Sequence, residues 1–241
     1  MAEAPNALAD TNDFEFAALS EARNYRAALF KEFGAHLKGE VLEVGAGVGQ
    51  MTEHLVSLPG VRRALAVEPD TAYCRRHREQ YPKHEVLEGT AADVPPGTAW
   101  DAILSINVLE HIGDDTGELR RYAQLLRERG GALCLFVPAR PEIYAPIDKD
   151  FGHFRRYTRP ELRDKLVGAG FDVLRLNYFN FVGYFAWWLN FCLLKKRAFE
   201  VAKVRLFDRA IFPSVHFLES GIARPPFGQS LIAVARSAGR S

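Results

Sequence analysis

A glycine-rich loop is the first part of the sequence whose residue types could do chemistry. It reads Gly45-Ala46-Gly47-Val48-Gly49, and it joins an apolar run at 41–44 to a segment of helical spacing. Glycine permits a sharp turn and close approach of a ligand. Amide groups at the start of a helix bind negative or polar groups. With the carboxylate of Glu43 just ahead of it, the loop predicts a site for a polar cofactor.

Two classes of cofactor suit such a loop. A dinucleotide fingerprint requires G-x-G-x-x-G, and Gln50 stands where the last glycine would be. S-adenosylmethionine has no pyrophosphate and carries an ammonium group, which suits Glu43. Glu68 ends the next apolar run, where a carboxylate can accept both hydroxyls of a ribose in either class. The alternative for Glu68 is a helix-capping or solvated acid. Gln50 and Glu43 favour S-adenosylmethionine over a nicotinamide cofactor.

Four segments in order resemble the motifs of class I S-adenosylmethionine-dependent methyltransferases, in a bacterial branch similar to methyltransferase types 11 and 12. They are residues 41–52, 66–70, 89–95 and 101–112. The resemblance implies that Asp93 accepts a hydrogen bond from the adenine amine and that Asn107 and Val108 lie beside the sulfonium. The cofactor-binding residues it implies are Glu43, Gly45, Gly47, Gly49, Glu68, Pro69, Ala92, Asp93, Asn107 and Val108.

Strands and helices alternate along the chain, which predicts an α/β fold. Strands are expected at 41–44, 63–67, 84–87, 100–106, 132–137, 171–176 and 228–235, and helices at 17–37, 51–58, 70–81, 114–129 and 160–168. The resemblance implies a Rossmann-like, mainly parallel sheet of order 3-2-1-4-5-7-6, with the last strand antiparallel. Residues 1–241 are expected to form one domain, with an N-terminal helical cap at 12–38 and a helical insertion or substrate lid at 177–226.

Composition excludes some functions and compartments. The 241 residues carry a formal net charge of +1, which gives no long-range field to collect nucleic acid. Cys74, Cys134 and Cys192 are too widely spaced for a disulfide framework or a zinc motif, so no metal site is predicted. The first 13 residues lack the features of a signal peptide, and a cytoplasmic location is expected.

Two histidines are candidate catalytic residues. A methyl donor mainly requires an aligned nucleophile and exclusion of water, and a phenol or alcohol also needs a base. His111 follows the fourth predicted strand, at the edge where α/β sites form. His153 lies in a loop that opens over the same edge. The alternatives are a histidine packed at a helix start and a salt-bridged loop.

Six further residues are candidates for binding the substrate. Arg155 and Arg156 could hold a carboxylate, phosphate or carbonyl-rich ring, and Tyr157 follows them in the same loop. Tyr25 lies on the N-terminal helix, and Tyr178 and Trp187 belong to an aromatic stretch. The alternatives are a salt bridge for Arg155, inward packing for Tyr157 and a core position for Tyr25.

That aromatic stretch, residues 176–194, contains no charged residue and is followed by Lys-Lys-Arg. Three asparagines and few branched aliphatic residues weigh against a membrane span. The preferred interpretation is a lid or wall of a substrate pocket. A peripheral membrane contact through 176–197 and a homodimer interface are the alternatives.

The predicted function is methyl transfer from S-adenosylmethionine to an oxygen, nitrogen or carbon atom of a small molecule in bacterial specialised metabolism. The alternatives are a lipid-linked or glycan acceptor at a membrane surface, a non-catalytic S-adenosylmethionine-binding module, and a nicotinamide oxidoreductase. No nucleic-acid partner is predicted.

Overall fold

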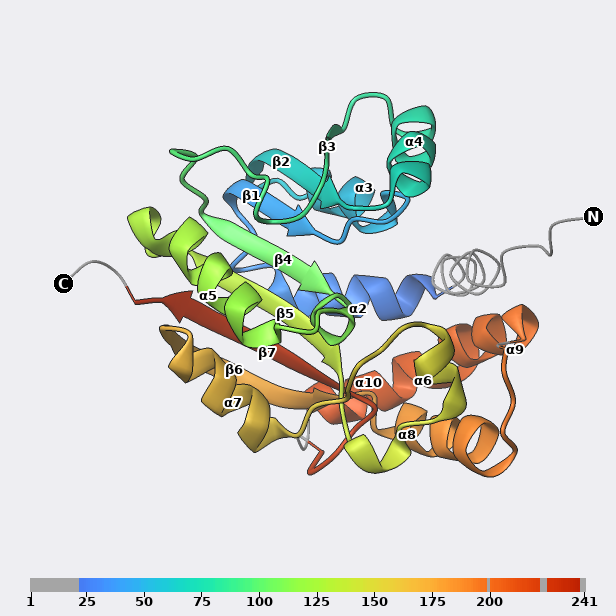
Figure 1. Cartoon of the computed structure of the whole chain (residues 1–241). Helices are drawn as coiled ribbons and strands as arrows, with labels where there is room; N and C mark the ends of the chain where they lie inside the picture. The colour runs from blue at the N-terminus through green and yellow to red at the C-terminus, as the bar shows by residue number, and fades with distance from the viewer. Residues whose placement is uncertain (1–21, 199, 222–224, 239–241) are drawn as a thin grey trace, which may run out of the picture.

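A seven-stranded sheet forms the centre of the computed structural model, which describes residues 22–198, 200–221 and 225–238 (Figure 1). The strands are β1 (Gly39–Val44), β2 (Val61–Glu68), β3 (Glu85–Glu88), β4 (Ala102–Ile106), β5 (Ala132–Pro138), β6 (Phe171–Phe179) and β7 (Ser230–Ser237). Their order is β3-β2-β1-β4-β5-β7-β6. The pairs from β3 to β5 are parallel, and β7 is antiparallel to both of its neighbours. The predicted order and the antiparallel last strand are confirmed.

The helices lie near the predicted positions. They are α2 (Arg23–Phe33), α3 (Gln50–Val56), α4 (Thr71–Gln80), α5 (Asp115–Leu126) and α7 (Arg159–Gly168), together with the short α6 (Pro146–Asp150), which was not predicted. Polar caps define two of their starts. The Asp70 carboxylate accepts from the first amides of α4, and Thr158 and Glu161 form a capping box on α7. The part of the predicted N-terminal cap before residue 22 lies outside the described residues.

A helical insertion separates β6 from β7, as predicted. It contains α8 (Phe181–Trp187), α9 (Val201–Leu206) and α10 (Phe212–Gly221), with π-helical turns at Trp188–Leu193 and Phe207–Ile211. Asn180 makes the change from strand to helix, because its backbone is left-handed (φ +61°) and its side chain accepts from the Gly183 amide at 2.9 Å. Within the described residues, every helix is too short or too polar to cross a bilayer.

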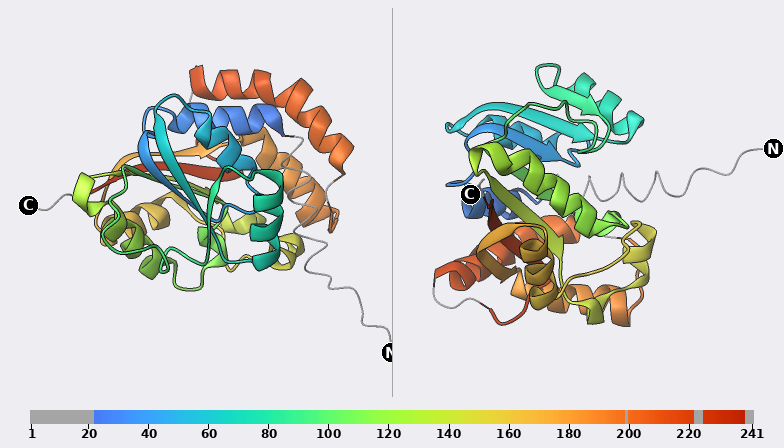
Figure 2. Two further views of the ribbon diagram at one scale, coloured as in Figure 1. Left: turned by 90° about the horizontal axis from the view of Figure 1, so that it is seen from above. Right: turned by 60° about the vertical axis from the view of Figure 1, so that its left-hand side comes forward.

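Both faces of the sheet are covered by helices. Every residue of β5 is buried, as the continuous apolar run predicts. Leu133 belongs to the core under α5 and α7, whereas its neighbour Cys134 belongs to the core under α2 and α10. Figure 2 shows these two helix pairs on opposite sides of the sheet.

The carboxyl ends of the parallel strands meet at one edge of the sheet. There the Gly45 amide donates to Val67 O at 2.8 Å, and the Asn107 amide donates to Phe136 O at 2.9 Å. The strand order reverses between β1 and β4, which is where open α/β sheets bind ligands. This edge is therefore where the candidate site must lie.

Candidate active site

The glycine loop between β1 and α3 has the backbone that its composition predicts. Gly45, Gly47 and Gly49 have φ values of +74°, +54° and +88°, which L side chains rarely adopt. A Cβ at Gly45 would lie 2.2 Å from Val108 Cγ2, and one at Gly49 would lie 2.5 Å from the His77 ring. The sequence suggested that these glycines make room for a ligand. At Gly45 and Gly49, the absence of a side chain also makes room for Val108 and His77 of the protein itself.

Glu68 ties the end of β2 to this loop. Its side chain is almost fully buried, and its two oxygens accept from the amides of Gly47 (2.8 Å) and Asp70 (3.0 Å). Burial raises the pKa of Glu68, while these two amide hydrogen bonds oppose the rise. A carboxylate offers about four acceptor sites, so capacity for two more donors remains. The Gly89 amide donates to Glu68 O at 2.9 Å and brings the loop after β3 alongside.

Glu43 is a buried acid at the end of β1. Its Oε2 has no hydrogen-bond partner among the residues that the structure describes. Burial and the nearby charge of Glu68 raise the pKa of Glu43 to about 8, against a hydrogen bond with Thr52. A buried acid with an unused oxygen provides the chemistry to bind an ammonium group. The site therefore fits a cofactor that carries both an amino group and a ribose.

Three of the predicted cofactor-binding residues lie at the surface. Ala92, Asp93 and Pro69 are exposed, and the Asp93 carboxylate accepts from Thr90 N (2.8 Å) and Thr90 Oγ1 (2.9 Å). These hydrogen bonds hold the pKa of Asp93 below its usual value. Asp93 is thus held as an ionised acceptor beside the β3 loop.

Asn107 connects the sheet edge to a cavity of about 450 Å³. The residue follows β4 with a φ of +52°. Five of the predicted site residues line this cavity: Tyr25, Asn107, His153, Arg156 and Trp187. Its other aromatic lining residues are Phe136, Phe151, Phe191 and Phe207. An apolar cavity with a few polar groups suits a small organic molecule.

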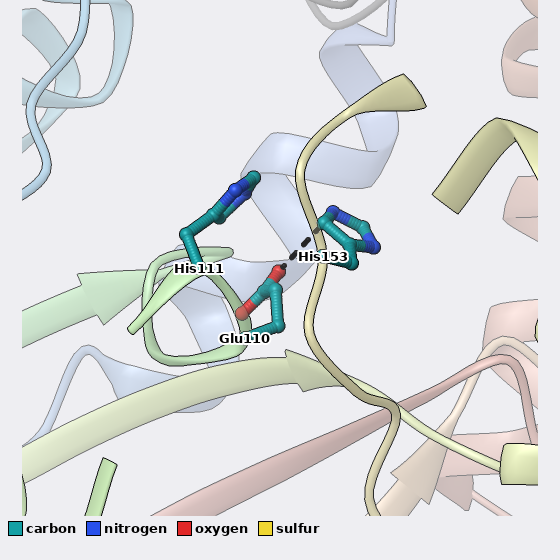
Figure 3. A group of neighbouring side chains, drawn as sticks. All are labelled: Glu110, His111 and His153. Atoms are coloured by element: carbon teal, nitrogen blue, oxygen red, sulfur yellow. Dashed lines mark ion pairs between the residues drawn. The ribbon is translucent and has the colours of Figure 1, made fainter. Parts of the chain in front are cut away.

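His111 and His153 come together although they are distant in sequence (Figure 3). Their ring centroids are 4.7 Å apart and nearly perpendicular. Burial, followed by the charge of His153, lowers the pKa of His111 to about 4. Nδ1 of His153 lies 2.9 Å from the Asp148 carboxylate, and its Nε2 lies 4.0 Å from Glu110.

The other predicted substrate residues lie outside the described lining of the cavity. Arg155 forms an ion pair with Asp115, and the buried Tyr157 donates its hydroxyl to the same carboxylate at 3.0 Å. Tyr178 packs against the sheet core with the Arg140 guanidinium 5.9 Å from its ring. Asp115 recruits the first two side chains because a buried carboxylate requires partners. They brace the loop that carries His153.

Two residues of this region, Glu110 and Asp148, were not predicted, whereas Arg156 was expected to hold a carboxylate, phosphate or carbonyl-rich ring. Glu110 has no exposed surface, and Asp148 and Arg156 form a buried ion pair at 2.8 Å. Arg156 also lies 4.3 Å from the Trp187 ring centroid. Glu110 could have been predicted from the sequence, because it directly precedes the candidate residue His111. Asp148 lies on α6 and His153 in the loop that follows it, and only the folded structure shows that their side chains meet.

Comparison with known proteins identifies the family of this chain. A family model described as a methyltransferase domain matches residues 15–176. A probable S-adenosylmethionine-dependent methyltransferase of Mycobacterium tuberculosis is 31% identical over 147 residues, which is 58% of this chain and 52% of the relative. A ubiquinone biosynthesis O-methyltransferase of a Ruegeria species is 30% identical over 108 residues, or 44% of each chain. The chain thus spans about half the length of these relatives.

Solved structures share the fold. An S-adenosylmethionine-dependent methyltransferase from Clostridium acetobutylicum superposes with a TM-score of 0.59 at 10% identity, covering 90% of this chain and 92% of the other. One from Mesorhizobium loti gives a TM-score of 0.58 at 16% identity, covering 87% and 97%. At these identities the likeness concerns the fold alone. Because the family model covers most of the sequence, the chain belongs to the methyltransferase domain family.

Proposed function

We propose that this protein transfers a methyl group from S-adenosylmethionine to an oxygen atom of a small, largely apolar molecule. The observation that carries this proposal is that Glu43, Glu68 and Asn107 all lie at the carboxyl edge of the sheet, and that Asn107 also lines the cavity. Glu43 holds the ammonium group of the cofactor, and Glu68 accepts from the ribose hydroxyls. When bound, S-adenosylmethionine supplies an electrophilic methyl group.

The acceptor occupies the cavity next to Asn107. Its aromatic walls bury an apolar body, while His153 contributes a polar group to the same wall. An oxygen acceptor is favoured because relatives at about half coverage are named ubiquinone biosynthesis O-methyltransferases. Nitrogen and carbon nucleophiles could be aligned with the methyl group in the same way, and they are the other outcomes of an acceptor screen.

The insertion between β6 and β7 acts as the lid of this cavity. Trp187 is buried against it, and the Trp187 indole N–H donates to Ile143 O at 3.1 Å. Phe207 and Ile211 extend the wall from the following helices. A cavity wall formed by the strand ends and by the insertion excludes water during methyl transfer.

A lipid-linked or glycan acceptor at a membrane surface is the second candidate. Large apolar side chains of the insertion are exposed, namely Phe185, Trp188, Leu189, Leu193, Leu194, Leu206 and Ile211. Lys195, Lys196 and Arg197 directly follow Leu194 in the chain. Such a surface suits contact with anionic lipid. Sedimentation with anionic vesicles tests it, and protein left wholly in the supernatant would contradict it.

Calorimetry with S-adenosylmethionine and with NAD tests the main proposal. We expect heat only with the former, and Glu68→Ala should weaken binding by at least about tenfold because two hydroxyl contacts are lost. Glu128→Ala is the control, because this exposed residue precedes the amino end of β5 and so lies away from the carboxyl edge that carries the site. Binding of NAD alone, or unchanged affinity in Glu68→Ala, would contradict the assignment. A methyl-transfer screen over phenols, alcohols and amines then separates an enzyme from a non-catalytic module.

A further inference from the structure

Three potential metal ligands converge beside the cavity: Glu110, His111 and His153. One ligand atom from each lies within 4.8 Å of the others. Figure 3 shows Glu110 and His111 leaving the turn after β4, with His153 facing them from the loop after α6. The Phe154 amide donates to Glu110 O at 2.8 Å, which ties these two segments together. Folding alone therefore brings the three side chains together.

The inner nitrogen of His153 is available to a ligand. Its side chain is only 6% exposed, and Nε2 has no hydrogen-bond partner among the described parts of the chain. A buried polar nitrogen without a partner is costly unless something binds it. The Glu110 carboxylate lies 4.0 Å from this nitrogen.

The outer nitrogen of His153 is held as a metal ligand requires. Nδ1 lies 2.9 Å from Asp148 Oδ1, and Asp148 is fixed in turn by Arg156 at 2.8 Å and by the Ala145 amide at 2.8 Å. A carboxylate on the outer nitrogen sets the tautomer and orientation of a ligating histidine and makes it a better donor. His153 thus has Nε2 available for a metal ion, while Asp148 holds its Nδ1.

We propose that Glu110, His111 and His153 bind a divalent transition-metal ion, with Zn²⁺ as the representative. Two histidines and one carboxylate form a known catalytic set for Zn²⁺ and leave a fourth position open. Donors in a tetrahedral site with bonds of about 2.0 Å lie about 3.3 Å apart, so small side-chain rotations from the present spacing suffice. No metal motif was predicted from sequence, because the ligands come from two distant segments.

The open position would take an oxygen of the methyl acceptor. His153 lines the cavity that also contains Asn107, so an ion held there borders the acceptor. Coordination lowers the pKa of a hydroxyl, whose proton passes to solvent. This inference rests on the proposed function for its purpose, but the binding of the ion can be measured without methyl transfer. Acceptors with an ionisable hydroxyl group are the class favoured by such a site.

Metal binding by the full chain is the test. After treatment with EDTA and its removal, Zn²⁺ calorimetry should give one site, and Co²⁺ should give visible absorption that Zn²⁺ displaces. Glu110→Gln and His153→Ala should each weaken Zn²⁺ binding by more than about tenfold. Loss of a residue that only supports a metal ligand already costs about that much. His36→Ala, a histidine near Arg175 and Lys38 at the end of α2, should bind as the wild type does.

The outcomes separate this inference from the proposed function. Absence of Zn²⁺ and Co²⁺ binding, or equal affinity in wild type and Glu110→Gln, would overturn the metal site. If the variants fail to fold, the wild-type stoichiometry and the intensity of the Co²⁺ absorption decide, since weak octahedral-type absorption would also overturn it. S-adenosylmethionine binding without metal binding leaves the methyltransferase intact. Metal binding without any methyl transfer leaves the ion site and removes the proposed function.

Discussion

The Asp148 carboxylate lies 2.9 Å from Nδ1 of His153, and this contact leaves Nε2 of the ring to face Glu110. Burial alone would raise the pKa of Asp148, but the hydrogen bond with His153 and the charge of Arg156 hold it below its usual value. The acid is therefore an ionised support for the histidine, and it gives His153 one orientation in the cavity wall.

Asp148→Asn should weaken the orientation of the His153 ring, although Asp148 is not among the described residues that line the acceptor cavity. We expect Zn²⁺ affinity to fall by about 10–100-fold and kcat to fall more than the acceptor KM rises. Stability should also drop by about 3–5 kcal/mol, because Arg156 would lose its buried partner.

Asp150→Asn is the matched control for Asp148→Asn. This residue ends the same helix but forms a partly exposed pair with Arg197, so its loss should matter by about 1 kcal/mol at most. Urea unfolding and metal titration of both variants check the prediction. Equal metal affinity in the two variants would contradict a supporting role for Asp148.

Gly45→Ala should destabilise the protein and weaken cofactor binding. The left-handed backbone makes alanine unfavourable by about 1–2 kcal/mol. Contact with Val108 adds roughly 1–3 kcal/mol. Gly97→Ala separates the two effects, because its φ is +82° but no described atom lies within 4 Å of the added Cβ.

Thermal melts and calorimetry with S-adenosylmethionine measure both effects of Gly45→Ala. Gly97→Ala should lose only the backbone part and keep the cofactor affinity. Adding Val108→Ala to Gly45→Ala should restore part of the stability. A Gly45→Ala protein as stable as Gly97→Ala would show that the contact with Val108 is unimportant.

Trp187→Phe should raise the acceptor KM by roughly tenfold with little change in cofactor affinity. The smaller ring leaves a gap in the cavity wall, loses the hydrogen bond to Ile143 O and reduces contact with Arg156. Trp188→Phe is the control, since its neighbouring ring is 45% exposed and is not among the described residues lining the cavity. Steady-state kinetics should distinguish the two variants, and equal KM values would argue against the lid.

Local patterns were sufficient to predict most of the fold. Asp70 signals a helix start because its carboxylate reaches amides only two and three residues ahead. β5 could be predicted because a strand covered on both faces needs a continuous apolar run. The strand order came from the resemblance to a family, since each strand alone is compatible with several orders.

The candidate site was only partly predictable, because its contacts cross the chain. Tyr157 and Arg155 look suited to a ligand in sequence, yet Asp115 on α5 takes both of them. The pairing of Asp148 with His153 depends on α6, a five-residue helix without a strong sequence signal. Residue types thus indicated the chemistry, while the partners depended on loops that come together only in the folded protein.

The buried Glu43 should make stability depend on pH. Its pKa rises from 4.5 to about 8 on folding, so between these values the folded state binds more protons than the unfolded state. The free energy of unfolding should therefore decrease as pH rises, by up to about 1.4 kcal/mol per pH unit. Glu43→Gln should lack this component and become the more stable protein above pH 8. Urea unfolding between pH 5 and 9 measures the difference.

S-adenosylmethionine should reverse this effect of Glu43. An ammonium group beside the carboxylate favours its ionised form, so saturating cofactor should stabilise the wild type most above pH 8 and stabilise Glu43→Gln less. Glu128→Gln, which changes an exposed carboxylate, should differ from the wild type by the same small amount at every pH. A constant difference between wild type and Glu43→Gln would mean that the acid titrates normally on folding. Equal stabilisation of wild type and Glu43→Gln by the cofactor would contradict the proposed ammonium contact.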